Sequence, residues 1–269
     1  MAALRIFSYL PNPRIWKATV TGRLCGVEVD VRGAPASELS KWLWDFDAQP
    51  LAGAAPHVLA AAEREGRIGF VDRKLYKTDA FLEAQPFGTV PAAFSPDGRI
   101  GIFESNSIMR AVARLATNRF PVYGQDAYES SRIDSFLDTG LVFGRDAQIY
   151  LLALRGSVSQ EVYKRAREAF ATYLAGIERA MAPGRSYLVG DDVTLADICF
   201  VAELCLFHNE RARLSVLKAA GFSPLLDDQF ESVYPRSVAH FKRLLMHPAF
   251  APDVRGYLDK IEASAGRNK

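Results

Sequence analysis

The chain has 269 residues, of which 49% are hydrophobic and 24% are charged. This composition is typical of a globular protein with one large or two moderate domains, and it excludes a disordered or fibrous chain. With 33 basic and 31 acidic side chains, the chain lacks the strong charge that would indicate a nucleic-acid or anionic-membrane partner. No apolar run has membrane-spanning length and the start has no signal-peptide pattern, so we expect a cytoplasmic protein.

The first elements in chain order are a strand, a helix and a second strand. Residues 4–10 predict a short strand, and residues 14–24 predict a helix that ends at Gly26. Residues 27–31 alternate strictly between apolar and polar, which indicates the second strand. A βαβ unit of this length implies that its two strands pair in parallel.

A long segment, about residues 37–76, follows this unit and contains no clean strand pattern. The spacing of its apolar residues predicts a helix over 37–46 and another over 56–65, and residues 79–84 predict a short helix or turn. Structured insertions of this length are often lids or interface elements. A surface embellishment without a role is the alternative.

The next feature is a β-hairpin over residues 92–103, predicted by two apolar runs joined by Pro-Asp-Gly. Pro91 follows Val90 at the first position of this hairpin, where a cis bond or an open edge is accommodated. An open edge leaves the N–H and C=O of Val90 for a peptide-like ligand. Glu104 and Ser105 then open an amphipathic helix, whose N-terminal N–H groups favour a ligand carboxylate.

These motifs, in this order and at this spacing, resemble the glutathione transferase superfamily. In that family the residue before the cis-proline pairs with the cysteinyl backbone of glutathione, and a Glu/Gln-Ser pair holds the γ-glutamyl group. The resemblance implies that Val90, Pro91, Glu104 and Ser105 bind glutathione as a co-substrate. It also implies a basic or amide partner for the glycyl carboxylate, for which Lys77 is a candidate. The fold it implies is an α/β thioredoxin-like N-terminal domain followed by an all-α C-terminal domain.

The apolar periodicity breaks over residues 117–124, which we interpret as the linker between the domains. We therefore expect the thioredoxin-like domain over 1–118, with an insertion at about 37–76, and an all-helical domain over 125–269. Apolar residues at helical spacing predict two long helices in the second domain, one around Ile133 and Leu137 and the other around Phe170 and Leu174.

Thr194 and Asp197 have the spacing of a capping box, with Val193 and Ile198 at the staple positions. We assign this structural cap to folding rather than chemistry, because such caps contribute about 1 kcal/mol to stability. The surrounding stretch is similar to the helical-domain signature of the family. The His-Pro-x-Phe ending at 247–250 and the earlier Glu-Ser-Asn-Ser-Ile run look most like the transferase-like domain of the elongation factor 1B gamma subunit.

The candidate catalytic residues are Asn12 and Ser8. A free thiol has a pKa of roughly 8.5, so glutathione conjugation requires a donor or helix N-terminus that favours the thiolate. Family members place Tyr, Ser or Cys near the end of the first strand, and Asn12 occupies the matching slot here. Its side-chain NH₂ can donate to the sulfur, or Asn12 is only a turn residue between two prolines. Ser8 lies on the preceding strand.

Because that slot holds no Tyr, Ser or Cys, three functions stay open. The first is a glutathione transferase whose thiolate attacks a small aromatic or hydrophobic electrophile; glutathione-dependent β-etherases, which cleave lignin-derived aryl ethers, are similar members. The second is a non-catalytic structural subunit, as the elongation-factor resemblance implies. The third is one subunit of a heterodimer whose partner supplies most of the activity. We expect a homodimer or a heterodimer with a related subunit.

The cysteines and histidines indicate no further chemistry. Cys25, Cys199 and Cys205 lack the paired spacing of a zinc site or a redox Cys-x-x-Cys, and they lie in apolar surroundings. We expect them to be buried thiols in a reducing compartment. The four histidines are scattered along the chain, so we expect no metal site.

Overall fold

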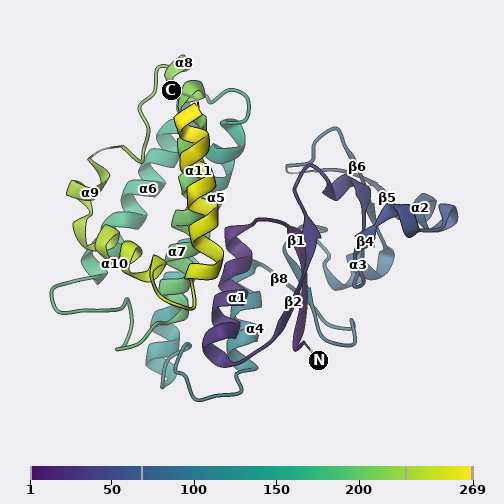
Figure 1. Cartoon of the computed structure of the whole chain (residues 1–269), viewed down its shortest axis with the longest axis horizontal. Coiled ribbons are helices and arrows are strands. Elements are labelled where there is room, and N and C mark those ends of the chain that lie inside the picture. Colours follow the sequence, from purple (N-terminus) through teal and green to yellow (C-terminus); the bar gives the residue numbers. More distant parts are fainter. Residues whose placement is uncertain (1, 68, 228, 268–269) are drawn as a thin grey trace. The chain divides into compact units, whose positions relative to one another are not determined.

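A computed structural model of the chain describes residues 2–67, 69–227 and 229–267. Its backbone contacts divide the chain into an N-terminal unit, Met1–Phe120, and a C-terminal unit, Pro121–Lys269. The N-terminal unit contains both strands and helices, and the described part of the C-terminal unit contains helices without strands (Figure 1). The predicted fold class, an α/β domain followed by a helical domain, is confirmed.

The first sheet of the N-terminal unit has the strand order β2-β1-β7-β8. Strand β1 (Leu4–Tyr9) pairs in parallel with β2 (Val29–Ala34), and helix α1 (Pro13–Cys25) connects them. The hairpin strands β7 (Ala92–Phe94) and β8 (Gly101–Phe103) pair with each other, and β7 also pairs antiparallel with β1. The βαβ unit and the hairpin predicted from the sequence are both confirmed.

Capping residues define both ends of helix α1. Its N-cap is Asn12, whose side-chain oxygen accepts from the N–H of Arg14 at 3.0 Å. Its C-cap is Gly26, which has the left-handed φ of +68° that favours glycine. Helix α4 (Ser105–Arg114) packs beside α1 within this unit (Figure 1).

The segment at about 37–76 forms a second sheet, so the prediction of a helix over 37–46 is wrong. The strand order is β4-β3-β6-β5. Its strands are β3 (Trp42–Trp44), β4 (Gln49–Pro50), β5 (Glu63–Glu65) and β6 (Lys74–Lys77). The spacing of apolar residues in 37–46 fits a helix. However, Trp42–Trp44 pairs with β6, about thirty residues later in the chain, and aromatic residues also favour strands.

The second helix predicted in this segment is only partly correct. Helix α2 covers Pro56–Ala62, whereas the last three residues of the predicted range belong to strand β5. Single 3₁₀ turns precede β3 and follow β4, at Leu39–Lys41 and Leu51–Gly53. Helix α3 (Asp79–Ala84) follows the segment, as predicted, with Thr78 as its N-cap.

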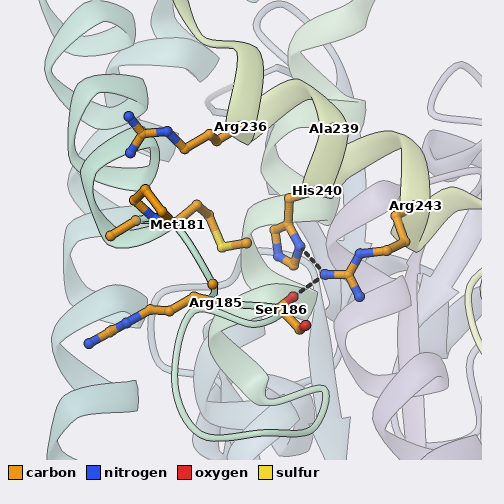
Figure 2. Close-up of a pocket in the computed structure, with 10 residues that line it drawn as sticks. Met181, Arg185, Ser186, Arg236, Ala239, His240 and Arg243 are labelled. Atoms are coloured by element: carbon orange, nitrogen blue, oxygen red, sulfur yellow. Dashed lines mark hydrogen bonds between the residues drawn. The ribbon is translucent and has the colours of Figure 1, made fainter.

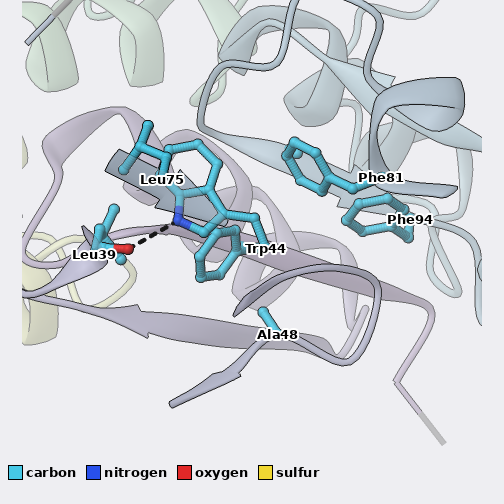
Figure 3. Close-up of a cluster of buried hydrophobic side chains, with 8 residues drawn as sticks. Leu39, Trp44, Ala48, Leu75, Phe81 and Phe94 are labelled. Carbon is cyan, nitrogen blue, oxygen red and sulfur yellow. Dashed lines mark hydrogen bonds between the residues drawn. The ribbon is translucent and has the colours of Figure 1, made fainter. Parts of the chain in front are cut away.

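An aromatic cluster joins the second sheet to the first (Figure 3). Trp44 of β3 contacts Phe7 of β1 and Phe81 of α3 edge to face, with ring centroids 5.5 and 5.9 Å apart. The indole N–H of Trp44 donates to the carbonyl of Leu39 at 3.0 Å. Aromatic pairs in these arrangements stabilise a core beyond the area they bury. The inserted segment therefore shares the core of the N-terminal unit and is not a surface embellishment.

The C-terminal unit is a helical bundle around α7. Its helices are α5 (Ala127–Ala153), α6 (Gln160–Ala180), α7 (Leu195–Phe207), α8 (Leu214–Ala219), α9 (Phe230–Val233), α10 (Pro235–Leu245) and α11 (Ala251–Arg267). A 3₁₀ segment, His208–Arg213, follows α7 directly. Every residue of α7 except Leu206 is buried, so this helix is the centre of the core. In the described ranges, none of the helices is both long and apolar enough to span a bilayer.

Candidate functional site

The open end of β7 lies at Val90 and Pro91, which are joined by a cis peptide bond. The ladder between β1 and β7 ends at the pair Phe7 and Ala92. Among the described residues, neither the N–H nor the C=O of Val90 has a hydrogen-bond partner in the protein. The side chain of Val90 packs partly against the aromatic cluster. This backbone is therefore available to another extended peptide.

The register of the hairpin brings the helix N-terminus to the same place. Ala92 pairs with Phe103 at the end of the ladder, so Pro91 and Glu104, the neighbours of this pair in the chain, leave the sheet at the same end. The two motifs, Val90-Pro91 and Glu104-Ser105, thus follow the same end of the first sheet.

The N-terminus of α4 has no side-chain cap. Its N-cap, Glu104, has an exposed side chain that makes no capping hydrogen bond, and its φ of +65° lies in the left-handed region. Ser105 is 7% exposed, and its hydroxyl has no hydrogen-bond partner in the described part of the protein. A hydroxyl in this position, together with the unpaired N–H groups of a first helical turn, forms an anion-binding arrangement.

Two buried side chains hold the loop that presents Val90. Gln85 donates to the carbonyl and to the hydroxyl of Thr89, at 3.1 and 2.9 Å. Lys77 donates from its Nζ to the carbonyl of Gly88 at 2.6 Å, and this ammonium also lies over the ring of Trp44. Burial lowers the pKa of Lys77, and the charges of neighbouring arginines lower it further. In this structure Lys77 supports the loop that leads to Val90.

Asn12 and Ser8 form a buried pair at the end of β1. The Asn12 side chain uses its oxygen to cap α1 and its nitrogen to donate to the hydroxyl of Ser8 at 3.1 Å. Both side chains are almost completely buried. This geometry gives Asn12 a helix-capping role, and the contact of either side chain with a thiol stays a prediction.

Asp197 is the centre of a buried network in the C-terminal unit. Its carboxylate accepts from the N–H and hydroxyl of Thr194, at 2.8 and 2.9 Å, and from the N–H of Leu188 at 3.0 Å. His240 of α10, also buried, lies 2.8 Å from the same carboxylate. His240 was not predicted from the sequence, because no local pattern links residues 43 positions apart. All the partners of Asp197 belong to the protein, which is the arrangement of a structural cap.

All three cysteines are free and buried, as expected, and burial raises the pKa of the Cys25 thiol to about 11. In the part of the chain that the structure describes, no group of three or more His, Cys, Asp or Glu side chains could hold a metal ion.

Three comparisons with known proteins agree with this architecture. Residues 133–248 match the family of the glutathione S-transferase C-terminal domain. Elongation factor 1-gamma 1 of Oryza sativa subsp. japonica is 29% identical over 184 residues, which are 65% of this chain and 38% of that protein. Glutathione S-transferase F9 of Arabidopsis thaliana is 32% identical over 131 residues, 46% of this chain and 60% of that protein. The chain therefore spans about two fifths of the length of the elongation factors it matches.

The fold is also found in solved structures. A glutathione S-transferase from Methylobacterium radiotolerans, in complex with glutathione sulfonate, superimposes with a TM-score of 0.61 and 16% identity. The superposition covers 93% of this chain and 94% of that one. At this identity the likeness establishes the fold of both halves. The helical half, residues 133–248, thus matches the family of the glutathione S-transferase C-terminal domain, and the chain as a whole has the glutathione transferase fold.

Proposed function

We propose that the N-terminal unit binds glutathione at the open end of β7 and that the protein is a glutathione transferase. The observation that carries the proposal is the pair of unpartnered groups at one end of the sheet, the Val90 peptide and the Ser105 hydroxyl. The cysteinyl backbone of glutathione would pair with Val90 as an added strand, and its γ-glutamyl carboxylate would meet Ser105 and the N-terminus of α4. Solved relatives of this fold hold glutathione derivatives, which supports the choice of ligand.

The glycyl end of the ligand has Lys77 as its proposed partner. The Nζ of Lys77 is already bonded to Gly88, two residues before Val90, and an ammonium has three donors. One of the remaining donors can meet a carboxylate without loss of the bond to Gly88. Lys77 would then act both as a support of the loop and as a contact of the ligand.

In the proposed reaction the thiol loses its proton and the thiolate attacks an electrophilic carbon. A sulfur–carbon bond forms, and the bond to the leaving group breaks. Asn12 and Ser8 lie at the end of β1, beside the position expected for the cysteinyl sulfur, because the β1–β7 register continues toward Pro91 and Val90. We propose that the Asn12 side-chain NH₂ is the donor to the sulfur. For an aryl ether the leaving group would be a phenolate, and this β-etherase reaction is one specific form of the proposal.

A non-catalytic subunit is the second candidate function. It is favoured by the likeness to elongation factor 1-gamma proteins and by the burial of the Ser8 hydroxyl, which accepts from the equally buried Asn12 amide. A protein of this kind would bind a partner chain, as a homodimer or a heterodimer, without turnover. Sedimentation of the purified chain, alone and with candidate partners, measures the assembly directly.

The binding proposal is tested by calorimetry with glutathione and two altered ligands. Cysteinylglycine lacks the γ-glutamyl group that would meet α4, and glutathione methylated at the cysteinyl amide nitrogen cannot donate to the Val90 carbonyl. We expect each to bind at least about tenfold more weakly than glutathione, since each lost charged or backbone hydrogen bond is worth roughly 1.5 kcal/mol. Equal binding of all three, or no binding of glutathione, contradicts the proposal.

A turnover assay distinguishes between the two candidate functions, a glutathione transferase and a non-catalytic subunit. A panel of aryl halides, aryl ethers and disulfides is assayed with glutathione, and the reference is the same panel without protein. Thiol-dependent consumption of any of them supports the transferase. The Asn12→Ala variant then tests the donor, because removal of a hydrogen bond to the thiolate should slow turnover by about tenfold or more. Binding of glutathione with no turnover across the panel favours the non-catalytic subunit.

A further inference from the structure

The side chain of Gln85 is buried at the C-terminal end of α3 and closes the loop that leads to Val90. Its Oε1 accepts from the N–H of Phe87 at 3.0 Å, and its NH₂ group donates to the carbonyl and hydroxyl of Thr89. Because a backbone N–H only donates and a carbonyl only accepts, these partners fix the orientation of the side-chain amide. Both nitrogen donors and the oxygen of Gln85 are thus engaged by this one loop.

The bond to the Thr89 carbonyl fixes the peptide group that contains the Val90 N–H. This peptide is trans, and in a planar trans peptide the C=O and the N–H point in opposite directions. Since the C=O of Thr89 points toward Gln85, the N–H of Val90 points away from it. This N–H has no hydrogen-bond partner among the described residues. Gln85 therefore sets the direction of a free backbone donor.

Two further contacts keep the loop in one conformation before any ligand arrives. Lys77 donates to the carbonyl of Gly88, and the Val90 side chain packs partly against the aromatic cluster. Gly88 has a left-handed φ of +60°, which favours glycine. The entropy cost of ordering the loop therefore falls on folding rather than on ligand binding.

A loop carbonyl in the C-terminal unit is also held by a side chain. Arg243 of α10 donates to the carbonyl of Ser186 and to Nδ1 of His240 (Figure 2). Beside this contact lies a hollow of about 330 Å³, between residues 181–186 and one face of α10. Its arginines come from both segments, but Arg185 and Arg243 extend in opposite directions in Figure 2. They do not converge on one ligand, so we assign the hollow none.

We propose that Gln85 is a positioning residue for glutathione, which aims the Val90 N–H at the cysteinyl carbonyl of the ligand without touching the ligand itself. The identity of the ligand rests on the proposed function. Hydrogen bonds in a chain polarise one another, so the bond from Gln85 to Thr89 also makes the Val90 N–H a stronger donor. The affinity for glutathione then depends on a side chain whose partners all belong to the protein.

Gln85→Glu tests this role by calorimetry with glutathione near neutral pH. The variant keeps the shape and the acceptor of Gln85 but removes both donors, and its carboxylate repels the Thr89 carbonyl. We expect glutathione to bind about tenfold more weakly or worse. The control Gln49→Glu makes the same change of charge at an exposed position of β4, in the same unit, and should change the affinity less than about twofold. Equal weakening by both variants overturns the proposal.

The pH profile of Gln85→Glu separates positioning from general damage to the fold. Burial beside a carbonyl raises the pKa of the introduced carboxyl above the ordinary value of about 4.3. Once protonated, this carboxyl has an O–H donor for Thr89 again. The affinity of the variant, relative to the parent at the same pH, should therefore recover as the pH falls. Gln85→Met has no titrating group and should show no recovery. A flat profile of Gln85→Glu contradicts the proposal.

The ligand-free protein provides a test that does not depend on glutathione. In ¹⁵N relaxation we expect the Val90 amide to have an order parameter of about 0.85 in the parent and below about 0.6 in Gln85→Met. Amides outside residues 85–90 report whether the variant is folded. A flexible Val90 amide in the parent overturns the proposal.

The binding and relaxation results together distinguish the two proposals. A parent that does not bind glutathione contradicts the proposed function, and with it the ligand named here. A parent that binds glutathione no better than Gln85→Glu and Gln85→Met contradicts only the role of Gln85.

Discussion

The N-termini of α4 and α7 differ in where their polar groups find partners. At α7 the Asp197 carboxylate accepts four hydrogen bonds, of which two come from Thr194 and one from His240. At α4 the Ser105 hydroxyl has no partner among the described residues, and Glu104 makes no capping bond. Both helices begin after a polar N-cap residue, Glu104 at α4 and Thr194 at α7. A helix N-terminus whose polar groups are hydrogen-bonded within the protein stabilises the fold, whereas one whose polar groups have no protein partner is available to a ligand.

The largest expected effect comes from Asp197→Ala. This variant leaves the Thr194 N–H and the ring N–H of His240 without acceptors in a buried place. Since each buried unsatisfied group costs about 1–3 kcal/mol, we expect the free energy of unfolding to fall by at least roughly 3 kcal/mol. Urea denaturation measures it, and Asp192→Ala, at an exposed position of the same loop, is the control. A loss below about 1 kcal/mol would show that this N-terminus is not a structural cap.

Ser105→Ala should give the opposite result at α4. The hydroxyl has no protein partner, so we expect the free energy of unfolding to change by less than about 0.5 kcal/mol. Glutathione affinity should fall about tenfold or more, because a hydrogen bond to a carboxylate is lost. Calorimetry and urea denaturation of the same sample measure both quantities. The control is Ser135→Ala, on the surface of α5. If the free energy of unfolding falls while the glutathione affinity does not, Ser105 is a structural residue. The proposed difference between the N-termini of α4 and α7 is then wrong.

Glu104→Gly tests the backbone conformation at the N-terminus of α4. Glu104 has a φ of +65° and a ψ of 124°, which is costly for any residue with a Cβ, by roughly 1–3 kcal/mol. Glycine removes most of that cost and adds unfolded-state entropy, so we expect a net stabilisation of about 0.5–1 kcal/mol. Glutathione binding should weaken at the same time, since the acidic side chain is lost. A variant that is less stable than the parent would mean that the Glu104 side chain contributes to folding.

The smallest effect concerns His208, directly after α7. Burial lowers the pKa of His208 in the folded protein. Between the ordinary pKa of about 6.5 and this lower value, the unfolded chain takes up a proton that the folded chain does not. The free energy of unfolding should therefore fall as the pH drops through this window, and His208→Gln should flatten that slope. His57→Gln, at an exposed position, is the control. An unchanged slope in His208→Gln contradicts the assignment.

Part of the candidate site was predictable from local sequence. Val90, Pro91, Glu104 and Ser105 follow one another within a short hairpin and helix start, and the hairpin register brings them together without any distant partner. Asn12 shows the limit of such reasoning. Its position was predicted, but only its buried bond to Ser8 shows that the side chain already has partners in the protein.

The sequence by itself determined the elements whose signals are local: the βαβ unit, the Pro-Asp-Gly hairpin and the capped start of α7. Backbone preferences and side-chain periodicity over a few residues are sufficient for these. Only the tertiary structure decided that Trp42–Trp44 is a strand, that His240 bonds to Asp197, and that arginines of two segments line one hollow. Each of these three features brings together residues that are far apart in the chain. Packing of the whole unit, rather than local preference, determines such contacts.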